Sequence, residues 1–188
     1  MDLFDLIQSQ LFNQNTMEEL AVDTKAEPKQ VEQLTKLAIP TMLEALRKNA
    51  SDEEGKQSLD RALDDHQEDP SDLLGFLKGA DQEDGDKILN HMFGNNREQV
   101  TNNLAKNSGL DLGTVINLLT KYAPMILSLL ALSKTNTQKA PTTQRKKTGM
   151  DLTDILGDLT GRTKKATEES NDGGLLDGLK DILGGFLG

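Results

Sequence analysis

The chain of 188 residues contains no cysteine and no tryptophan, and it has only one tyrosine and five phenylalanines. The absence of cysteine excludes disulfides, thiolate catalysis and cysteine-bound metals. Hydrophobic residues make up 35% of the chain, below the ~45–50% of typical globular proteins. The core must therefore be built from aliphatic side chains and methionine, and part of the chain is expected to lie outside it.

Long hydrophobic runs are also scarce. The N-terminal segment "MDLFDLIQSQL" is acidic and amphipathic and lacks the basic n-region of a secretory signal, which favours a cytoplasmic protein. The most apolar stretch is Val115–Leu132, and Asn117, Lys121 and Pro124 interrupt it. Because a membrane-spanning helix needs ~20 mostly apolar residues, we expect a buried central helix and no membrane span.

Negative charge is concentrated in one window. The net charge is −10, and residues 51–88 hold 13 acidic and four basic residues. Such a surface repels nucleic acid and favours solubility, so no nucleic-acid partner is expected. A solvated helical face is the ordinary explanation of a run of this kind.

Motifs that carry chemistry are missing. No P-loop, dinucleotide fingerprint or nucleophile elbow is present, and the two histidines, His66 and His91, lack zinc-ligand spacing. His91 lies in "ILNHMFG", shortly before Gly94, where it suits the last turn of a helix. We therefore interpret His91 as part of the scaffold.

The carboxylate-dense segment Asp64–Asp72 is a candidate calcium site. An EF-hand loop needs acidic or Asn ligands at positions one, three and five and Gly at six. Starting at Asp64 or Asp65 places Asp69 or Pro70 at position six. No register fits, so we predict no catalytic, cofactor-binding or metal-binding residue, no cofactor and no enzymatic activity.

Two parts of the chain align without gaps. They are Leu20–Leu46 and Leu104–Leu130, which share Leu-Ala, Val, Leu and Pro positions, including Pro40 and Pro124. The match predicts two copies of one unit, a short helix followed by a long helix; chance similarity between Leu-rich helices is the alternative. The paired prolines predict a built-in bend in each long helix, either a static fit to the core or a hinge.

Helix ends in the first unit have recognisable signals. Thr16 and Glu19 have the spacing of a capping box, which predicts a short helix over about Met17–Val22. Pro28 suits the first turn of the long helix. Farther along, Ser51 and Glu54 have the same capping spacing and predict the start of an acidic helix.

The composition changes after the second unit. Residues 133–150 have five basic and no acidic residues and too few apolar ones to fold, so we expect a disordered linker. Its basic cluster fits weak nucleic-acid contact or self-association with the acidic face. The Gly/Leu-rich segments Asp151–Leu159 and Gly174–Gly188 predict short amphipathic helices, which are marginal alone and order only against a partner. That partner is the protein's own domain, another copy of the chain or the groove of a second protein. A flexible tail without a role is the alternative.

These features together resemble the bacterial domain-of-unknown-function 937 family, which is related to YidB-like proteins. The resemblance covers about residues 1–132 and is strongest over Ile88–Gly94 and Leu104–Leu130. It implies an all-helical bacterial domain and no established activity. The segment near Asp64–Asp72 departs from the family pattern, so any cation binding there is not carried over.

We therefore predict an all-α, multi-helix bundle built from two pseudo-repeated units, with a disordered linker and short tail helices. The expected function is a non-enzymatic protein-interaction or structural module that binds a protein partner or self-associates through the tail, with a homo-oligomer as one outcome. Removing residues 134–188 should leave a cooperatively folded domain. A small-ligand or divalent-cation-binding protein is the alternative. The expected divisions are a helical domain at 1–132 (units at about 11–47 and 92–132, acidic insert 51–90), a linker at 133–150 and a tail at 151–188.

Overall fold

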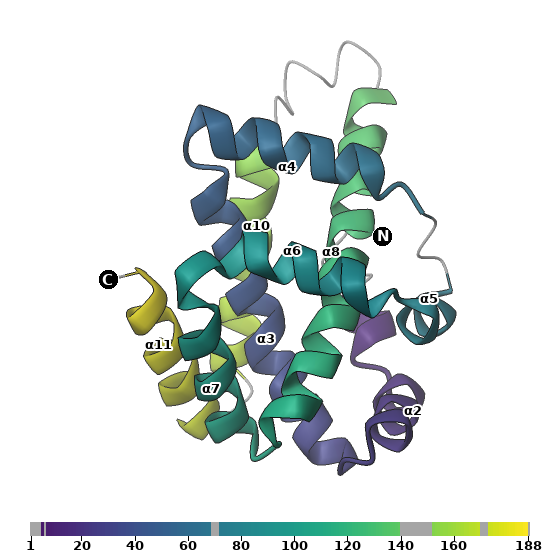
Figure 1. Ribbon diagram of the computed structural model, residues 1–188, viewed down its shortest axis with the longest axis vertical. Helices are drawn as coiled ribbons and strands as arrows, with labels where there is room; N and C mark the ends of the chain where they lie inside the picture. The colour runs from purple at the N-terminus through teal and green to yellow at the C-terminus, as the bar shows by residue number, and fades with distance from the viewer. Residues whose placement is uncertain (1–4, 6, 69–71, 140–151, 170–172, 188) are drawn as a thin grey trace.

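The computed structural model describes residue 5 and residues 7–68, 72–139, 152–169 and 173–187. Within these ranges every regular element is a helix, so the predicted all-α class is confirmed. The long helices α3 and α8 form the centre, α4 and α6 cross them, and α10 and α11 lie along the outside (Figure 1). The elements in chain order are η1 (Ile7–Leu11), α2 (Gln14–Thr24), α3 (Pro28–Asn49), α4 (Glu53–Asp65), α5 (Leu73–Gly79), α6 (Gln82–Phe93), η2 (Gly94–Asn96), α7 (Arg97–Ser108), α8 (Leu112–Lys139), α10 (Leu152–Glu169) and α11 (Gly173–Leu187).

The pairs α2–α3 and α7–α8 share local details at positions that the sequence alignment matches. Lys25 ends α2 with φ 55°, and Gly109 ends α7 with φ 73°, so both turns use a left-handed residue. Near those ends, the Thr24 and Ser108 hydroxyls each donate to the carbonyl one helical turn earlier, at 2.7 Å. Both long helices contain the interior proline. A duplicated origin explains these matches but stays a prediction.

The two pairs also contact each other at the matched ends of their short helices. Lys121 of α8 donates to the carboxylate of Asp23 at 2.7 Å, and Gln33 of α3 donates to the carbonyl of Asn107 at 2.9 Å. Asp23 and Asn107 are matched by the sequence alignment of the two units, so each long helix binds the end of the other pair's short helix. The arrangement joins the pairs into one core.

The core between α3 and α8 is aliphatic with one polar link. Leu34 and Leu118 are both fully buried, as are Val31 and Val115. In the same layer Tyr122 is completely buried, and its hydroxyl lies 2.8 Å from the hydroxyl of Thr35. This hydrogen bond satisfies two polar groups that would otherwise destabilise the interior.

Among the described residues one helical window, Leu112–Lys134, is long and apolar enough to cross a membrane. However, 83% of its most apolar stretch is buried inside the protein. The helices α6, α7, α5 and α4 pack around it. Burial on this scale is what the central helix of a folded domain shows.

Several predicted boundaries were wrong. α2 begins at Gln14, because the Asn13 side chain accepts a hydrogen bond from the Asn15 N–H, whereas Thr16 is buried inside the helix. α4 is capped by Asp52, the residue after the predicted Ser51. In both cases an Asn or Asp within three residues of the predicted cap provides the capping oxygen. Pro28 does start α3, as predicted.

The predicted linker begins too early in the sequence. α8 continues to Lys139, so the start of the segment assigned to the linker, 133–139, is helical. Lys134 lies 2.8 Å from the carboxylate of Asp60, which ties this extension to α4. The rest of the predicted linker, from residue 140, lies outside the described residues. The first tail helix, α10, is longer than predicted, at 18 residues.

Candidate helix-docking site

The structure brings both histidines to one groove between α4 and α6. The groove has a volume of about 830 Å³ and a floor of buried apolar side chains. His66 lies at the C-terminal end of α4 beside the first turn of α6, whereas His91 lies in the last turn of α6, so the two histidines line different ends of the groove. Their common groove forms only when α4 and α6 both cross the central helices (Figure 1). The floor consists of Leu46, Leu59, Met92 and Leu127.

His66 is held at both ring nitrogens. Nδ1 lies 2.7 Å from the carbonyl oxygen of Ala62, and Nε2 lies 2.8 Å from the carboxylate of Asp84. Burial alone would lower the pKa of His66, but the hydrogen bonds to Asp84 and Ala62 outweigh it and raise that pKa above its ordinary value. A doubly protonated ring donates to both acceptors, so His66 joins the end of α4 to the start of α6.

This arrangement leaves His66 poorly suited to base catalysis. A general base needs a ring nitrogen whose lone pair faces a nucleophile. Here both nitrogens face acceptors, a carbonyl and a carboxylate. The helix ends also favour the ion pair, since a cation suits the C-terminus of α4 and an anion suits the first turn of α6.

No group of three or more His, Asp or Glu residues that could hold a metal ion occurs among the described residues. His91 occupies the last turn of α6, as predicted, and its side chain is exposed. Gly94 follows that helix with φ 51°. The side-chain amide of Asn49 donates to the carbonyls of His91 and Met92, which caps the C-terminal end of α6.

A second feature is the face of α3 and α7 that the tail covers. α10 packs along α3, and α11 packs along α7 and also contacts α3 (Figure 1). Among the tail side chains that the structure describes, the leucines and isoleucines are buried, while residues such as 154, 158, 177 and 181 on the opposite sides are exposed. We call the surface formed by α3 and α7 beneath these helices the docking face. The apolar tail side chains buried there are Ile155, Leu156, Leu159, Leu179, Ile182 and Leu183.

Glu44 of α3 forms the polar centre of this contact. Its side chain is 1% exposed and lies 2.5 Å from Arg47 Nη2 and 3.2 Å from Lys164 Nζ, a residue of α10. Burial alone would raise the pKa of Glu44, but the hydrogen bonds and charges of Arg47 and Lys164 hold it below its ordinary value. The ion pair with Lys164 favours one register of α10 on α3, because a shifted helix would lose this contact and leave Glu44 with Arg47 alone.

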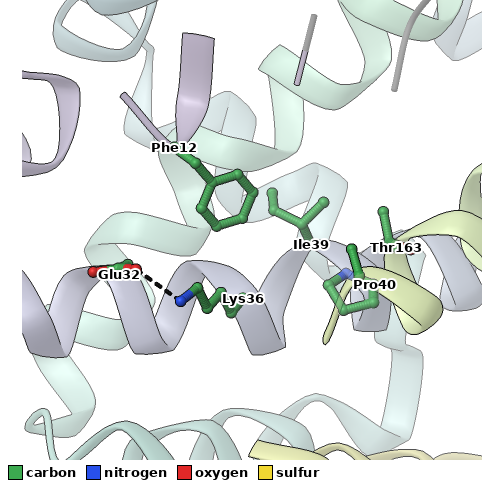
Figure 2. Close-up of a pocket in the computed structure, with 7 residues that line it drawn as sticks. Phe12, Glu32, Lys36, Ile39, Pro40 and Thr163 are labelled. Carbon is green, nitrogen blue, oxygen red and sulfur yellow. Dashed lines mark ion pairs between the residues drawn. The ribbon is translucent and has the colours of Figure 1, made fainter. Parts of the chain in front are cut away.

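The two tail helices approach the docking face differently. α11 uses glycines for close contact: a Cβ added at Gly178 would lie 2.8 Å from the Asn107 side chain, and one at Gly185 would lie 2.2 Å from the Gln99 side chain. α10 instead leaves a crevice of about 130 Å³ beside Pro40. Figure 2 shows Phe12, Ile39 and Thr163 converging on it.

The sequence predicted an amphipathic tail but not the surface of α3 and α7 on which it packs. Glu44 is read from the sequence as one more charged residue of an amphipathic helix, yet it is buried because α10 covers it. Its partner Lys164 lies far along the chain, on a separate helix, and no local pattern reveals the pairing. An all-helical body with two amphipathic helices on one face is the class that this geometry defines.

The chain belongs to a family of bacterial proteins of unknown function, DUF937, whose model matches residues 5–133. The resemblance stated from the sequence is therefore confirmed. No curated protein and no solved structure matched the chain. The family match ends near the end of α8, so α10 and α11 lie outside it.

Proposed function

We propose that this protein is a non-enzymatic interaction module whose docking face on α3 and α7 binds amphipathic helices. One observation carries the proposal. The two helices that occupy the face, α10 and α11, lie outside the family match, and they bury their apolar sides against helices inside it. The tail is then a bound ligand that belongs to the same chain.

The chemistry of the contact fits helix recognition. The apolar positions 155, 156 and 159 repeat with helical spacing, as do 179, 182 and 183. Grooves that bind amphipathic helices recognise apolar side chains at this spacing. Glu44 adds a charged centre that selects a basic residue. The preferred partner is thus an amphipathic helix with a Leu/Ile stripe and one lysine beside it.

The test uses the full chain with Leu156→Asp, measured by hydrogen exchange and mass spectrometry. Leu156 is fully buried, so the new charge should release α10 and expose amides 152–169 while 7–139 stay protected. Gly157→Asp is the matched control, because a Cβ there meets nothing within 4 Å. Loss of protection throughout 7–139 would contradict the proposal, since α10 would then be part of the body itself. Unchanged protection of 152–169 would also contradict it.

A ligand-binding protein is the second candidate, and the groove of about 830 Å³ that holds His66 and His91 favours it. Its acidic rim includes Asp52, Asp65 and Asp84. Calorimetric titration with calcium, magnesium and zinc tests the cation form of this idea. Absence of heat together with an unchanged melting temperature would remove it.

A further inference from the structure

The tail helices have features of a segment that docks and leaves again. In α10, a Cβ added at Gly157 or Gly161 would meet nothing within 4 Å, and the same holds for Gly184 in α11. Close packing therefore does not require glycine at these positions, yet each glycine costs about 0.5–1 kcal/mol of helix stability relative to alanine. Helices this weak form mainly when the docking face orders them.

The register of the docked tail is nevertheless specified. Lys164 reaches the buried carboxylate of Glu44, and Gly178 and Gly185 fit against the side chains of Asn107 and Gln99. A partner that reproduces all of these contacts must carry the same residues at the same spacing. The tail of a second copy of this chain does so by identity.

Exchange requires that the connection between α8 and α10 can span to a second copy. Residues 140–151 separate the end of α8 from the start of α10, and a segment of that length extends to about 40 Å. Docking within one chain is favoured by an effective concentration in the range of about 1 mM. Docking between chains makes the same contacts, so it competes once the protein concentration approaches that range.

We propose that the docking face also accepts α10 and α11 from a second copy, so that two chains exchange tails reciprocally. This inference rests on the proposed function, and it adds the identity of the partner. The exchanged dimer is symmetric, since each chain gives its tail and receives the other's. Glu44 of one copy would then pair with Lys164 of its partner.

The absence of cysteine allows a direct test. Lys36, labelled in Figure 2, and Ala166 both line the crevice between α3 and α10. Full-length Lys36→Cys and Ala166→Cys proteins, of different mass tags, are unfolded together, refolded at about 1 mM and oxidised. A mixed disulfide forms in quantity only when α10 of one copy lies on α3 of the other. Its yield is normalised to the disulfide within a chain that carries both substitutions.

The control pair is Lys36→Cys with Gly157→Cys, because position 157 faces open space. We expect the Ala166 pair to exceed this control at least about fivefold at about 1 mM, and the excess to fall on dilution below the effective concentration. Equal yields for the two pairs at every concentration would overturn the exchange. Release of amides 152–169 by Leu156→Asp would still uphold the proposed function in that case, so the two failures are distinguishable.

A second variant makes the test independent of disulfide geometry. Gly157→Ala with Gly161→Ala strengthens α10 without a new contact, so the docked tail should open less often. Tail exchange between tagged, folded copies, followed by native mass spectrometry, should slow at least about threefold. An unchanged rate of dimer formation would contradict exchange through release of α10.

Discussion

The two long helices occupy matching positions in the two units, but different helices pack against them. α8 is crossed by α6, which belongs to the part of the chain matched by the family, and α3 is covered by α10, which lies outside it. The α6 contact is between backbones: a Cβ added at Gly85 would lie 2.0 Å from the Thr120 carbonyl oxygen. At Lys36, which the sequence alignment of the two units matches with Thr120, the cover leaves a crevice instead.

Under the proposed function, this difference distinguishes a structural contact from a binding contact. The backbone of α6 at Gly85 lies directly against the backbone of α8, which cannot rearrange as a side chain can. A larger residue at position 85, or a different helix in place of α6, would therefore not fit there. The α10 contact depends on side chains and on one ion pair, which a second helix could reproduce. Under the proposed function, the contact of α6 with α8 is permanent, whereas the contact of α10 with α3 is reversible.

The largest effect is expected from Gly85→Val. The new side chain would meet the backbone of α8, so we expect a loss of at least about 3 kcal/mol in the free energy of unfolding. Urea unfolding followed by circular dichroism measures it. A loss below about 1 kcal/mol would show that the α6 contact is as adaptable as the α10 contact.

Leu118→Ala and Leu156→Ala sharpen the comparison, since both residues are fully buried. Each removal should cost about 2–4 kcal/mol, but in different places. Leu118→Ala should destabilise every slowly exchanging amide of 7–139, whereas Leu156→Ala should affect only the tail. Hydrogen exchange at several urea concentrations distinguishes the two, and equal effects on both regions would break the distinction.

Glu44→Gln removes the charge at the centre of the docking face and should destabilise the docked tail by about 1.5–3 kcal/mol. Because the pKa of Glu44 is lowered by folding, its charge contributes stability above the ordinary pKa, and this is lost as pH falls through the folded pKa. Tail protection in the parent chain should therefore weaken in acid more than in Glu44→Gln. Parallel acid profiles would contradict the role of the pair.

Gly157→Ala with Gly161→Ala should act in the opposite direction. Each substitution should stabilise α10 by about 0.5–1 kcal/mol, because neither Cβ meets a neighbour. Thermal unfolding of the tail, followed by a fluorophore attached at position 166, measures the gain. A loss of stability would mean that these positions pack against something in the folded protein.

The smallest effect is expected at the histidine groove. The pKa of His66 is raised by folding, so its ion pair stabilises the protein below the ordinary pKa of histidine and is lost as pH rises through the folded value. Asp84 is 44% exposed, which limits the contribution to about 1 kcal/mol or less. The difference in stability between His66→Gln and the parent should shrink from pH 5.5 to pH 8.5. A constant difference would contradict the assignment.

The sequence predicted the fold well because its signals are local or repeated. Periodic leucines, Pro28 and the gapless match between the two units identify the helices, and Gly94 marks the end of α6. It misplaced the caps at Thr16 and Ser51 because Asn13, three residues before Thr16, and Asp52, directly after Ser51, provide the capping oxygens.

The candidate sites were predicted poorly because they are made by distant residues. Nothing near His66 in the chain identifies Asp84 as its partner, and nothing near Glu44 indicates Lys164. Both pairings depend on which helices pack against each other, and no local pattern in a single sequence reports this. The amphipathic tail was predicted, and its seat on α3 and α7 was not.

Binding of the tail to the body in two separate molecules tests the central claim most directly. A body of residues 1–139, cut where α8 ends, is titrated with a peptide of residues 152–187, and heat and helicity are recorded. We expect a cooperatively folded body, saturable one-to-one binding with a gain of helix in the peptide, and loss of binding with Leu156→Asp. A folded body that gives no heat and induces no helix in the peptide would contradict the account.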